Sequence, residues 1–279
     1  MHLGFERAEP LAARKAAKGH LIWRLFKKEL RLHQLAWIVA GLYAAGYVAA
    51  VVSKRGSATL DDIITIITII YTGVVAILIG SLASAEERQF GTHDVQLLLP
   101  VAASRQWMVK AGTALGLSGL LAITLPIALA VVLPPGRLPP FGRRGIVQPQ
   151  MIITIATFTT IALYVSSLSS SGLRALMISI PAVFAAFLFM INVAMPVSFS
   201  IFRAIYHPGV SRLHFHPSVV SDRVFYPVAF AALRLLLLRF AFTHQRWASP
   251  GLLLIGRHVV LIAGAIVACF ALAGVLGVR

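Results

Sequence analysis

The chain has 279 residues, of which 58% are hydrophobic and only 12% are charged, with a mean hydropathy of +0.85. A soluble domain has about 25% charged residues, so this composition excludes an ordinary soluble fold, which would lack the polar surface to cover itself. Lys and Arg number 25 against 9 Asp and Glu, a formal net charge of +16. The basic residues lie mainly between apolar runs, where they contact anionic headgroups, so we expect membrane lipid as a partner and no nucleic acid.

Residues 1–34 form a basic amino-terminal region that precedes the first apolar run. Within it, residues 19–34 alternate apolar and basic side chains at helical spacing, which predicts an amphipathic helix lying in the membrane interface. The alternative is that these residues are only the charged start of the first span. The basic cluster also predicts a cytoplasmic amino terminus for a multi-pass protein of the cell membrane.

Apolar runs of about 20 residues, the length that a helix needs to cross a bilayer, recur along the chain. Because backbone amides in lipid must be paired within the chain, these runs predict helices, and the fold class is an all-α integral membrane protein. Six spans are predicted at 35–52, 63–83, 107–133, 151–167, 173–195 and 251–278.

A further apolar run at 226–242 contains Arg234 and Arg239. It is either a seventh span, whose arginines snorkel or face the protein interior, or a helix at the membrane surface; its length favours a span. We therefore expect six or seven transmembrane helices in a single transmembrane domain, 1–279, with a loop at 197–225.

The segment between the second and third predicted spans reads SAEERQFGTHDVQLLLPVAASRQWMVKA and contains a short leucine-rich stretch at 97–99. Gly91 can end the helix that leaves the membrane, and Thr92 can cap a new one. Pro100 would stop that helix, and Ser104 can cap the helix that enters the third span. The pattern predicts a short cytoplasmic helix that either docks on a partner protein or rests on lipid.

This segment resembles the signature that follows the second span in permease subunits of the ABC-2 type transporter family. The residues that carry the resemblance are Glu86, Arg88, Gly91, Thr92, Gln96, Leu97, Leu98, Pro100, Arg105 and Lys110. The chain departs from the family pattern in reading VAAS after Pro100 and in having His93 and Asp94. The resemblance is specific over residues 84–111 and extends as an order of elements over 19–196.

The resemblance implies a permease subunit whose cytoplasmic coupling segment, 85–106, sits in a cleft of a separate ABC ATPase subunit. The implied coupling residues include Glu87 and Leu99 besides those that carry the resemblance. A second permease subunit, identical or related, would complete the transport path. No G-x-x-x-x-G-K-[ST] loop occurs in the sequence, so we expect no cofactor in this chain, with ATP and Mg²⁺ bound by the partner. The sparse charge in the spans favours export of an apolar or amphipathic substrate.

Two alternatives stay open beside the transporter. Glu86 and Glu87 resemble the paired glutamates of CAAX-type intramembrane proteases, but the arginine that should follow four residues later is absent, because residue 91 is glycine. No H-E-x-x-H or G-x-S-x-G motif occurs, and His207, His214 and His216 are interpreted as loop residues rather than metal ligands, so we expect no enzyme. A membrane anchor or regulator that transports nothing is the second alternative.

Hydroxyl side chains recur within the second and fourth predicted spans, and Asn192 lies in the fifth. The threonines are Thr65, Thr68, Thr72, Thr154, Thr157, Thr159 and Thr160. They either line a transport path or bond to their own helix and its neighbours, and the second interpretation is the commoner behaviour of threonine in membrane helices.

Overall fold

A computed structural model describes the chain over residues 23, 25–53, 58–89, 102–133, 149–189, 192, 226–245, 256–265 and 268. Every secondary-structure element within these residues is a helix. The elements are α2 (Gln34–Ser53), α3 (Ala58–Gln89), α5 (Ala103–Ser118), a π-helical segment η1 (Gly119–Thr124), α6 (Leu125–Val132), α7 (Pro149–Leu168), α8 (Gly172–Phe189) and α11 (Tyr226–Gln245). Residues 25–32, called here the leading helix, are helical before α2, and residues 256–265 are helical after α11.

Five helices are long and apolar enough to cross a membrane: Gln34–Ser53, Asp62–Ala85, Ala103–Val132, Met151–Leu168 and Gly172–Phe189. They coincide with the first five predicted spans, which confirms a membrane-embedded, multi-pass helical protein. The run at 226–242 is helical as α11 but is not among the five, and the span at 251–278 is described only in part. Crossing of the membrane by these two segments stays a prediction.

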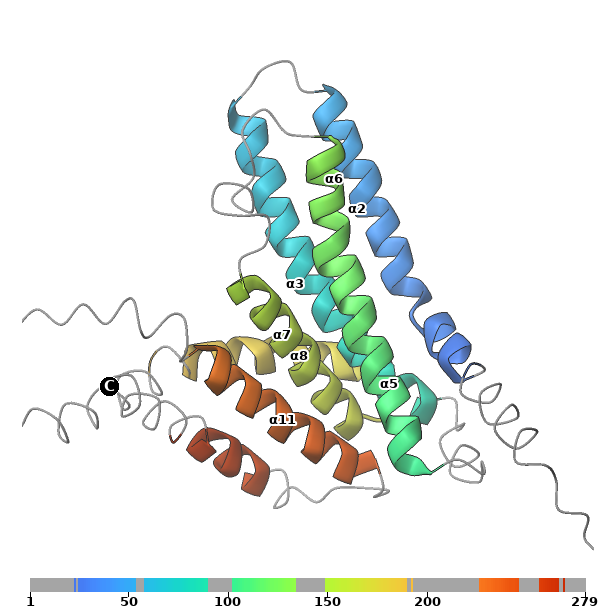
Figure 1. Ribbon diagram of the computed structural model, residues 1–279, viewed down its shortest axis with the longest axis vertical. Coiled ribbons are helices and arrows are strands. Elements are labelled where there is room, and N and C mark those ends of the chain that lie inside the picture. Colours follow the sequence, from blue (N-terminus) through green and yellow to red (C-terminus); the bar gives the residue numbers. More distant parts are fainter. Residues whose placement is uncertain are drawn as a thin grey trace, which may run out of the picture.

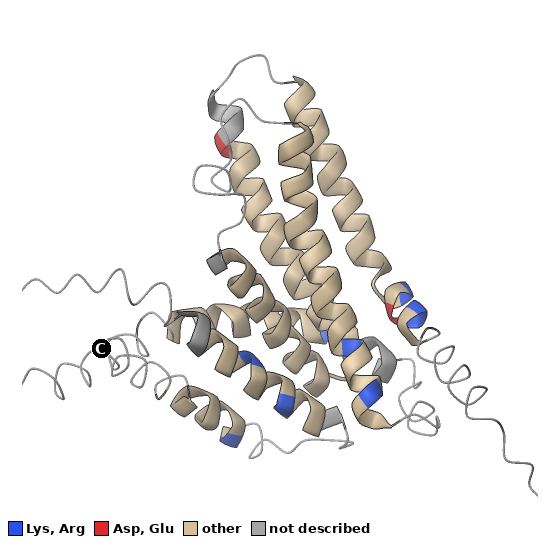
Figure 2. Ribbon diagram, in the orientation of Figure 1, with Lys and Arg blue, Asp and Glu red and all other residues tan. Residues whose placement is uncertain are grey.

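The long helices α2, α3 and the continuous run α5–η1–α6 lie side by side, and α7, α8 and α11 pack beside their lower halves (Figure 1). Helix α7 contacts α3, α5, α8 and α11, so it is the centre of the bundle. The Lys and Arg positions coloured in Figure 2 lie in the lower half of the view, and an acidic position lies near the upper end of α3. Over the described residues, one end of the long helices is therefore basic and the other is not.

The apolar outer surface of the bundle fits a lipid environment. On α2, Ala36, Ala40, Tyr43 and Tyr47 form one buried stripe, whereas Leu42 is 69% exposed. Large apolar side chains are exposed in the same way on α3 and α8, among them Ile63, Ile66, Ile67, Ile69, Ile70, Leu173, Met177, Ile178, Ile180, Phe184 and Phe187. A continuous apolar surface of this size would promote aggregation in water, but in a bilayer it is the surface that lipid tails solvate.

Helices α3 and α7 approach each other closely at Gly80. A Cβ atom at this position would collide with the carbonyl oxygen of Thr159 and lie 2.7 Å from Ala162 Cβ. Membrane helices gain attraction mainly from such close backbone packing, because lipid tails are as apolar as leucine and supply no hydrophobic drive between helices. Glycine is thus required at position 80 by the neighbouring helix.

One turn further along α3, the hydroxyl of Ser166 on α7 accepts hydrogen bonds from the backbone amides of Ser84 and Ala85, each at 2.9 Å. All three residues are buried. A polar link at this depth fixes the register of the two helices, since a shift along either axis would leave the Ser166 oxygen without these donors.

The third span contains a π-helical turn, Gly119–Thr124, and Pro126 follows it two residues later. In this turn the Leu125 amide donates to Leu120 O, five residues back. The corresponding donor for Leu121 O would be the amide of residue 126, which is proline and has no N–H. The hydroxyl of Tyr71 on α3 donates to Leu121 O instead, at 2.9 Å.

The hydroxyl groups of the spans bond mostly to their own helices. Thr68, Thr157, Thr159 and Thr160 each donate to the carbonyl four residues earlier, at 2.6–3.0 Å. Thr159 also bonds across to Ser118 on α5, at 2.6 Å. For these four threonines the helix-bonding interpretation is confirmed. The exposed Asn192 likewise donates to the carbonyl of Leu188 at 2.9 Å.

The predicted cap at Ser104 is wrong. Helix α5 begins at Ala103 with Ala102 as its N-cap residue and no side-chain cap, so Ser104 lies inside the first turn. The carbonyl of Ala102 accepts from the amides of Arg105 and Gln106, at 2.9 and 3.2 Å. The helix thus extends one turn further towards the coupling segment than the apolar pattern indicated, because Ala103, Arg105 and Gln106 are good helix formers, whereas the polar residues at 104–106 add nothing to the apolar run.

Candidate coupling site

The coupling segment predicted at 85–106 is described at its two ends. Helix α3 continues past the membrane-spanning stretch to Gln89, two residues before Gly91, and α5 begins at Ala103. Glu86, Glu87 and Arg88 lie in the last turns of α3, where only the helical backbone is described. The remaining predicted residues of the segment lie outside the described residues: Gly91, Thr92, Gln96, Leu97, Leu98, Leu99 and Pro100.

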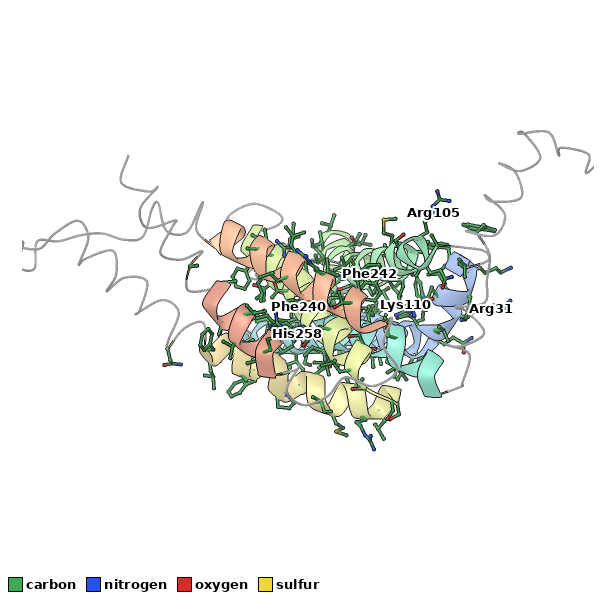
Figure 3. All side chains as sticks on the ribbon, turned by 90° about the horizontal axis from the view of Figure 1, so that it is seen from below. Arg31, Arg105, Lys110, Phe240, Phe242 and His258 are labelled. Atoms are coloured by element: carbon green, nitrogen blue, oxygen red, sulfur yellow. The ribbon has the colours of Figure 1, made fainter. Side chains whose placement is uncertain are left out.

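The two basic residues predicted on the α5 side have opposite environments. Arg105 is exposed, whereas Lys110, little more than one turn further, is only 2% exposed. Viewed from below, Lys110 lies among the helices, and Arg105 and Arg31 point outwards (Figure 3). The first turns of α5 therefore carry one cation available to headgroups or a partner and one held inside the bundle.

His33 joins the leading helix to the rest of this region. The helix is interrupted at His33, whose amide donates to Leu30 O, three residues back, at 3.3 Å. The His33 ring is fully buried, with Nδ1 2.8 Å from Glu29 O and Nε2 3.1 Å from Ile79 O on α3. Both oxygens only accept hydrogen bonds, so a neutral ring, with one N–H, can donate to one of them, and only the imidazolium can donate to both.

Burial lowers the pKa of His33 below its ordinary value of 6.5, and the positive charge of Lys110 lowers it further. The two carbonyl contacts act in the opposite direction and offset part of this effect. The carboxylate-bearing residue Glu29 is buried at the same junction, with 4% exposure. Three ionisable residues from the leading helix, the break after it and α5 are thus gathered where these elements meet α3.

A second polar contact fastens the carboxyl-terminal part of the described chain to α7. The ring of His258 stacks on Phe240 of α11, with centroids 4.0 Å apart, and its Nδ1 lies 3.3 Å from the hydroxyl of Tyr164 on α7. Figure 3 shows Phe240 and His258 next to each other. The contact ties the helix at 256–265 to both α11 and α7.

Metal chemistry gains no support from the described part of the chain, which holds no group of three or more His, Cys, Asp or Glu side chains that could bind an ion. His207, His214 and His216 lie outside the described residues.

Sequence reasoning missed His33, Glu29, Tyr71, Gly80 and Ser166 as positioning residues. The signal that could have found His33 and Glu29 was their place at the boundary between a basic helix and an apolar run, where an ionisable side chain must either reach the headgroups or be buried with partners. The roles of Gly80 and Ser166 depend on which helix packs against them, and the residue pattern within one span does not predict its neighbour.

Comparison with known proteins finds no family model that matches the chain, no curated relative and no similar solved structure. The fold defines the class as a multi-pass membrane protein built of helices.

Proposed function

We propose that this chain is the transmembrane permease subunit of an ABC-2 type transporter, powered by a separate ATPase subunit. The proposal rests on the resemblance over residues 84–111. The cargo we propose is apolar or amphipathic, moved outwards, with a second permease subunit completing the path.

The observation that best supports the proposal is the placement of the ends of the coupling segment. Helix α3 ends at Gln89 and α5 begins at Ala103, and both ends lie at the basic end of the bundle with the leading helix (Figure 2). Under the positive-inside rule the basic end faces the cytoplasm, which is where ATP is available. A segment held between two rigid spans at that end is suited to transmit a push from a cytoplasmic partner.

The interior of the bundle supports transmission of such a push. Gly80 and Ser166 lock α3 to α7, and Tyr71 ties α3 to the π-helical turn of the third span. A displacement of the lower ends of α3 and α5 would therefore move packed helices together rather than one helix alone.

The deciding experiment compares ATP hydrolysis by the purified chain with hydrolysis after co-purification with its ATPase subunit, in lipid nanodiscs. We expect none from the chain alone and turnover only in the complex, because the chain carries no phosphate-binding loop. Hydrolysis by the chain alone that is abolished by mutations within it would overturn the proposal. Failure of any ATPase to co-purify would favour the anchor or the protease-like alternative.

A further inference from the structure

The leading helix presents two chemically opposite faces. Glu29 is buried on the inner face, as is His33 at the break that follows, whose ring approaches carbonyl oxygens of the leading helix and of α3. Lys27 and Arg31 are exposed on the outer face, about one helical turn apart. Glu29 is the only acidic residue in the sequence between 23 and 53, so no carboxylate of this stretch neutralises the outer face.

The outer face continues along α2 as a stripe of apolar side chains. Leu35, Ile38 and Leu42 are all exposed, at spacings that keep them on one side of the helix. From Leu35 to Leu42 the helix rises roughly 10 Å. Trp23, which is 61% exposed, precedes Lys27 by one turn, and tryptophan is typical of the headgroup level. Positive charge is thus followed by an apolar stripe, an order that complements an acidic phospholipid, whose negative phosphate is followed by its acyl chains.

We propose that this side of the chain is a binding site for one acidic phospholipid. Lys27 and Arg31 hold the phosphate-bearing headgroup, and the acyl chains lie along Leu35, Ile38 and Leu42. A headgroup with a net negative charge is required, because the quaternary ammonium of a zwitterionic lipid would be repelled by the same two cations. The ligand is therefore a lipid such as phosphatidylglycerol rather than phosphatidylcholine. The site lies within this chain, so it depends neither on the transporter proposal nor on an ATPase subunit.

The inner face of the leading helix holds the cations in place before the lipid arrives. Leu30 packs against the hydrophobic core of the bundle, and the His33 ring joins the leading helix to α3. Arg31 points away from the bundle (Figure 3). A ligand that meets an ordered site loses less free energy to ordering than one that must fold a helix on contact. Binding should therefore saturate at one lipid per chain, whereas an unanchored basic helix attracts an acidic membrane in proportion to its surface charge.

The test titrates phosphatidylglycerol into the full chain in a mild non-ionic detergent and follows the bound lipid by native mass spectrometry. We expect one phosphatidylglycerol to bind before any other, roughly 25-fold more tightly than phosphatidylcholine, because each of the two cations contributes about fivefold. Lys27→Gln and Arg31→Gln should each weaken binding of this lipid by about fivefold. Equal affinity of the parent protein for the two lipids would overturn the site.

Two further variants distinguish a site from general positive charge. Arg239→Gln removes an exposed cation from α11, and therefore the same net charge as Arg31→Gln, but should leave binding of phosphatidylglycerol unchanged. Arg31→Lys keeps a cation on the outer face and should retain most of the affinity. If Arg239→Gln weakened binding as much as Arg31→Gln, only the overall charge would attract the lipid, and the proposal would be wrong.

Thermal melting gives a second measurement on the same proteins. Phosphatidylglycerol should raise the melting temperature of the parent protein, as any ligand of the folded state does. The double variant Lys27→Gln/Arg31→Gln should melt with the parent when no lipid is added, because both side chains are exposed, and should gain nothing from the lipid. An equal gain in both proteins would contradict the site.

A soluble anion is the remaining alternative occupant of the two cations. Inorganic phosphate in excess should not displace the bound phosphatidylglycerol, since it lacks acyl chains to pack along α2. Displacement of the lipid by phosphate would show that the outer face binds a phosphate group alone, and the lipid assignment would then be lost.

Discussion

The hydroxyl of Tyr71 donates to the carbonyl oxygen of Leu121 at 2.9 Å, and this bond supplies the donor that Pro126 cannot. The π-helical turn displaces each hydrogen bond by one residue, so Leu121 O faces a residue without an amide proton. In the middle of a membrane no water is available to take its place. The two spans are therefore joined at the point where the third is least able to pair its own backbone.

Tyr71→Phe should lower the free energy of unfolding by about 1 kcal/mol. This value lies between the mean contribution of a hydrogen bond between membrane helices and the penalty for an unsatisfied buried carbonyl. The ring keeps its stacked contact with Tyr43, whose centroid lies 3.8 Å away, so packing is preserved. Unfolding in mixed micelles with increasing SDS would measure the change.

The control restores a backbone donor. Pro126→Ala returns an amide proton to residue 126, so Tyr71→Phe in that background should cost clearly less than in the parent protein. Tyr43→Phe is the variant matched to Tyr71→Phe, because it also removes one tyrosine hydroxyl from the bundle. Its partner, Thr68, keeps its own bond to Ile64 O at 2.7 Å when that hydroxyl is removed. Equal costs for Tyr71→Phe in both backgrounds would show that the hydroxyl does not compensate for the proline.

Gly80→Ala should weaken the contact between α3 and α7 by about 1–3 kcal/mol, the usual cost of overfilling a packed interior. The new methyl group would meet the carbonyl of Thr159, which belongs to a rigid helix backbone and cannot rotate aside. Gly73→Ala on the same helix is the matched control, because the nearest atom to its added Cβ, on Phe158, is 4.0 Å away. Thermal melting of both variants in detergent compares them, and similar melting temperatures would contradict the close approach.

The positions of the first five spans could be predicted from hydropathy, because a bilayer imposes one length on any helix that crosses it. The helix ends were harder: α5 begins at Ala103 although the apolar run starts at Trp107, since a helix continues in water wherever nothing stops it. Pro126 signals an irregularity in the third span, but only the position of Tyr71 explains a π-helical turn there. A contact such as that of Gly80 with Thr159 depends on which two helices pack together. The sequence of either helix alone does not show this.

Topology is predicted to place the amino terminus and residues 85–106 on the same, cytoplasmic face. The basic cluster places the amino terminus in the cytoplasm. Because two spans separate it from residues 85–106, that segment must lie on the same face. Single cysteines at Ala13 and at His93 in a Cys269→Ser background should resist a membrane-impermeant maleimide added to intact cells and react after lysis. Labelling of either cysteine from outside would show that the orientation is wrong.

Glu86→Ala should leave binding of the ATPase subunit intact but reduce its turnover in the complex. Glu86 lies in the last turns of α3, where a charge-assisted hydrogen bond from the coupling segment to its carboxylate would tie that segment to the span. An exposed pair would contribute only about 0–1 kcal/mol, so binding itself should not suffer. Pull-down of the ATPase and its hydrolysis rate in membranes separate the two effects, and unchanged turnover would assign the residue no role in coupling.

Leu98→Asp should disconnect the ATPase subunit while the spans remain inserted. A buried leucine contributes about 1.5–3 kcal/mol to a contact, and a carboxylate in its place must also be desolvated, so an apolar docking contact would be lost. The residue lies between α3 and α5, outside both membrane-crossing stretches, so insertion should be unaffected.

Ala102→Asp is the control for that substitution, because it adds the same charge to the same connection at an exposed N-cap position, where aspartate favours the helix. Co-purification of the ATPase and its turnover in membranes should both fall strongly in Leu98→Asp and stay near the parent level in Ala102→Asp. Equal behaviour of the two variants would mean that the leucines at 97–99 do not dock on a partner. The case for a transporter subunit would then lose its main support, because the resemblance places the energy input at this helix.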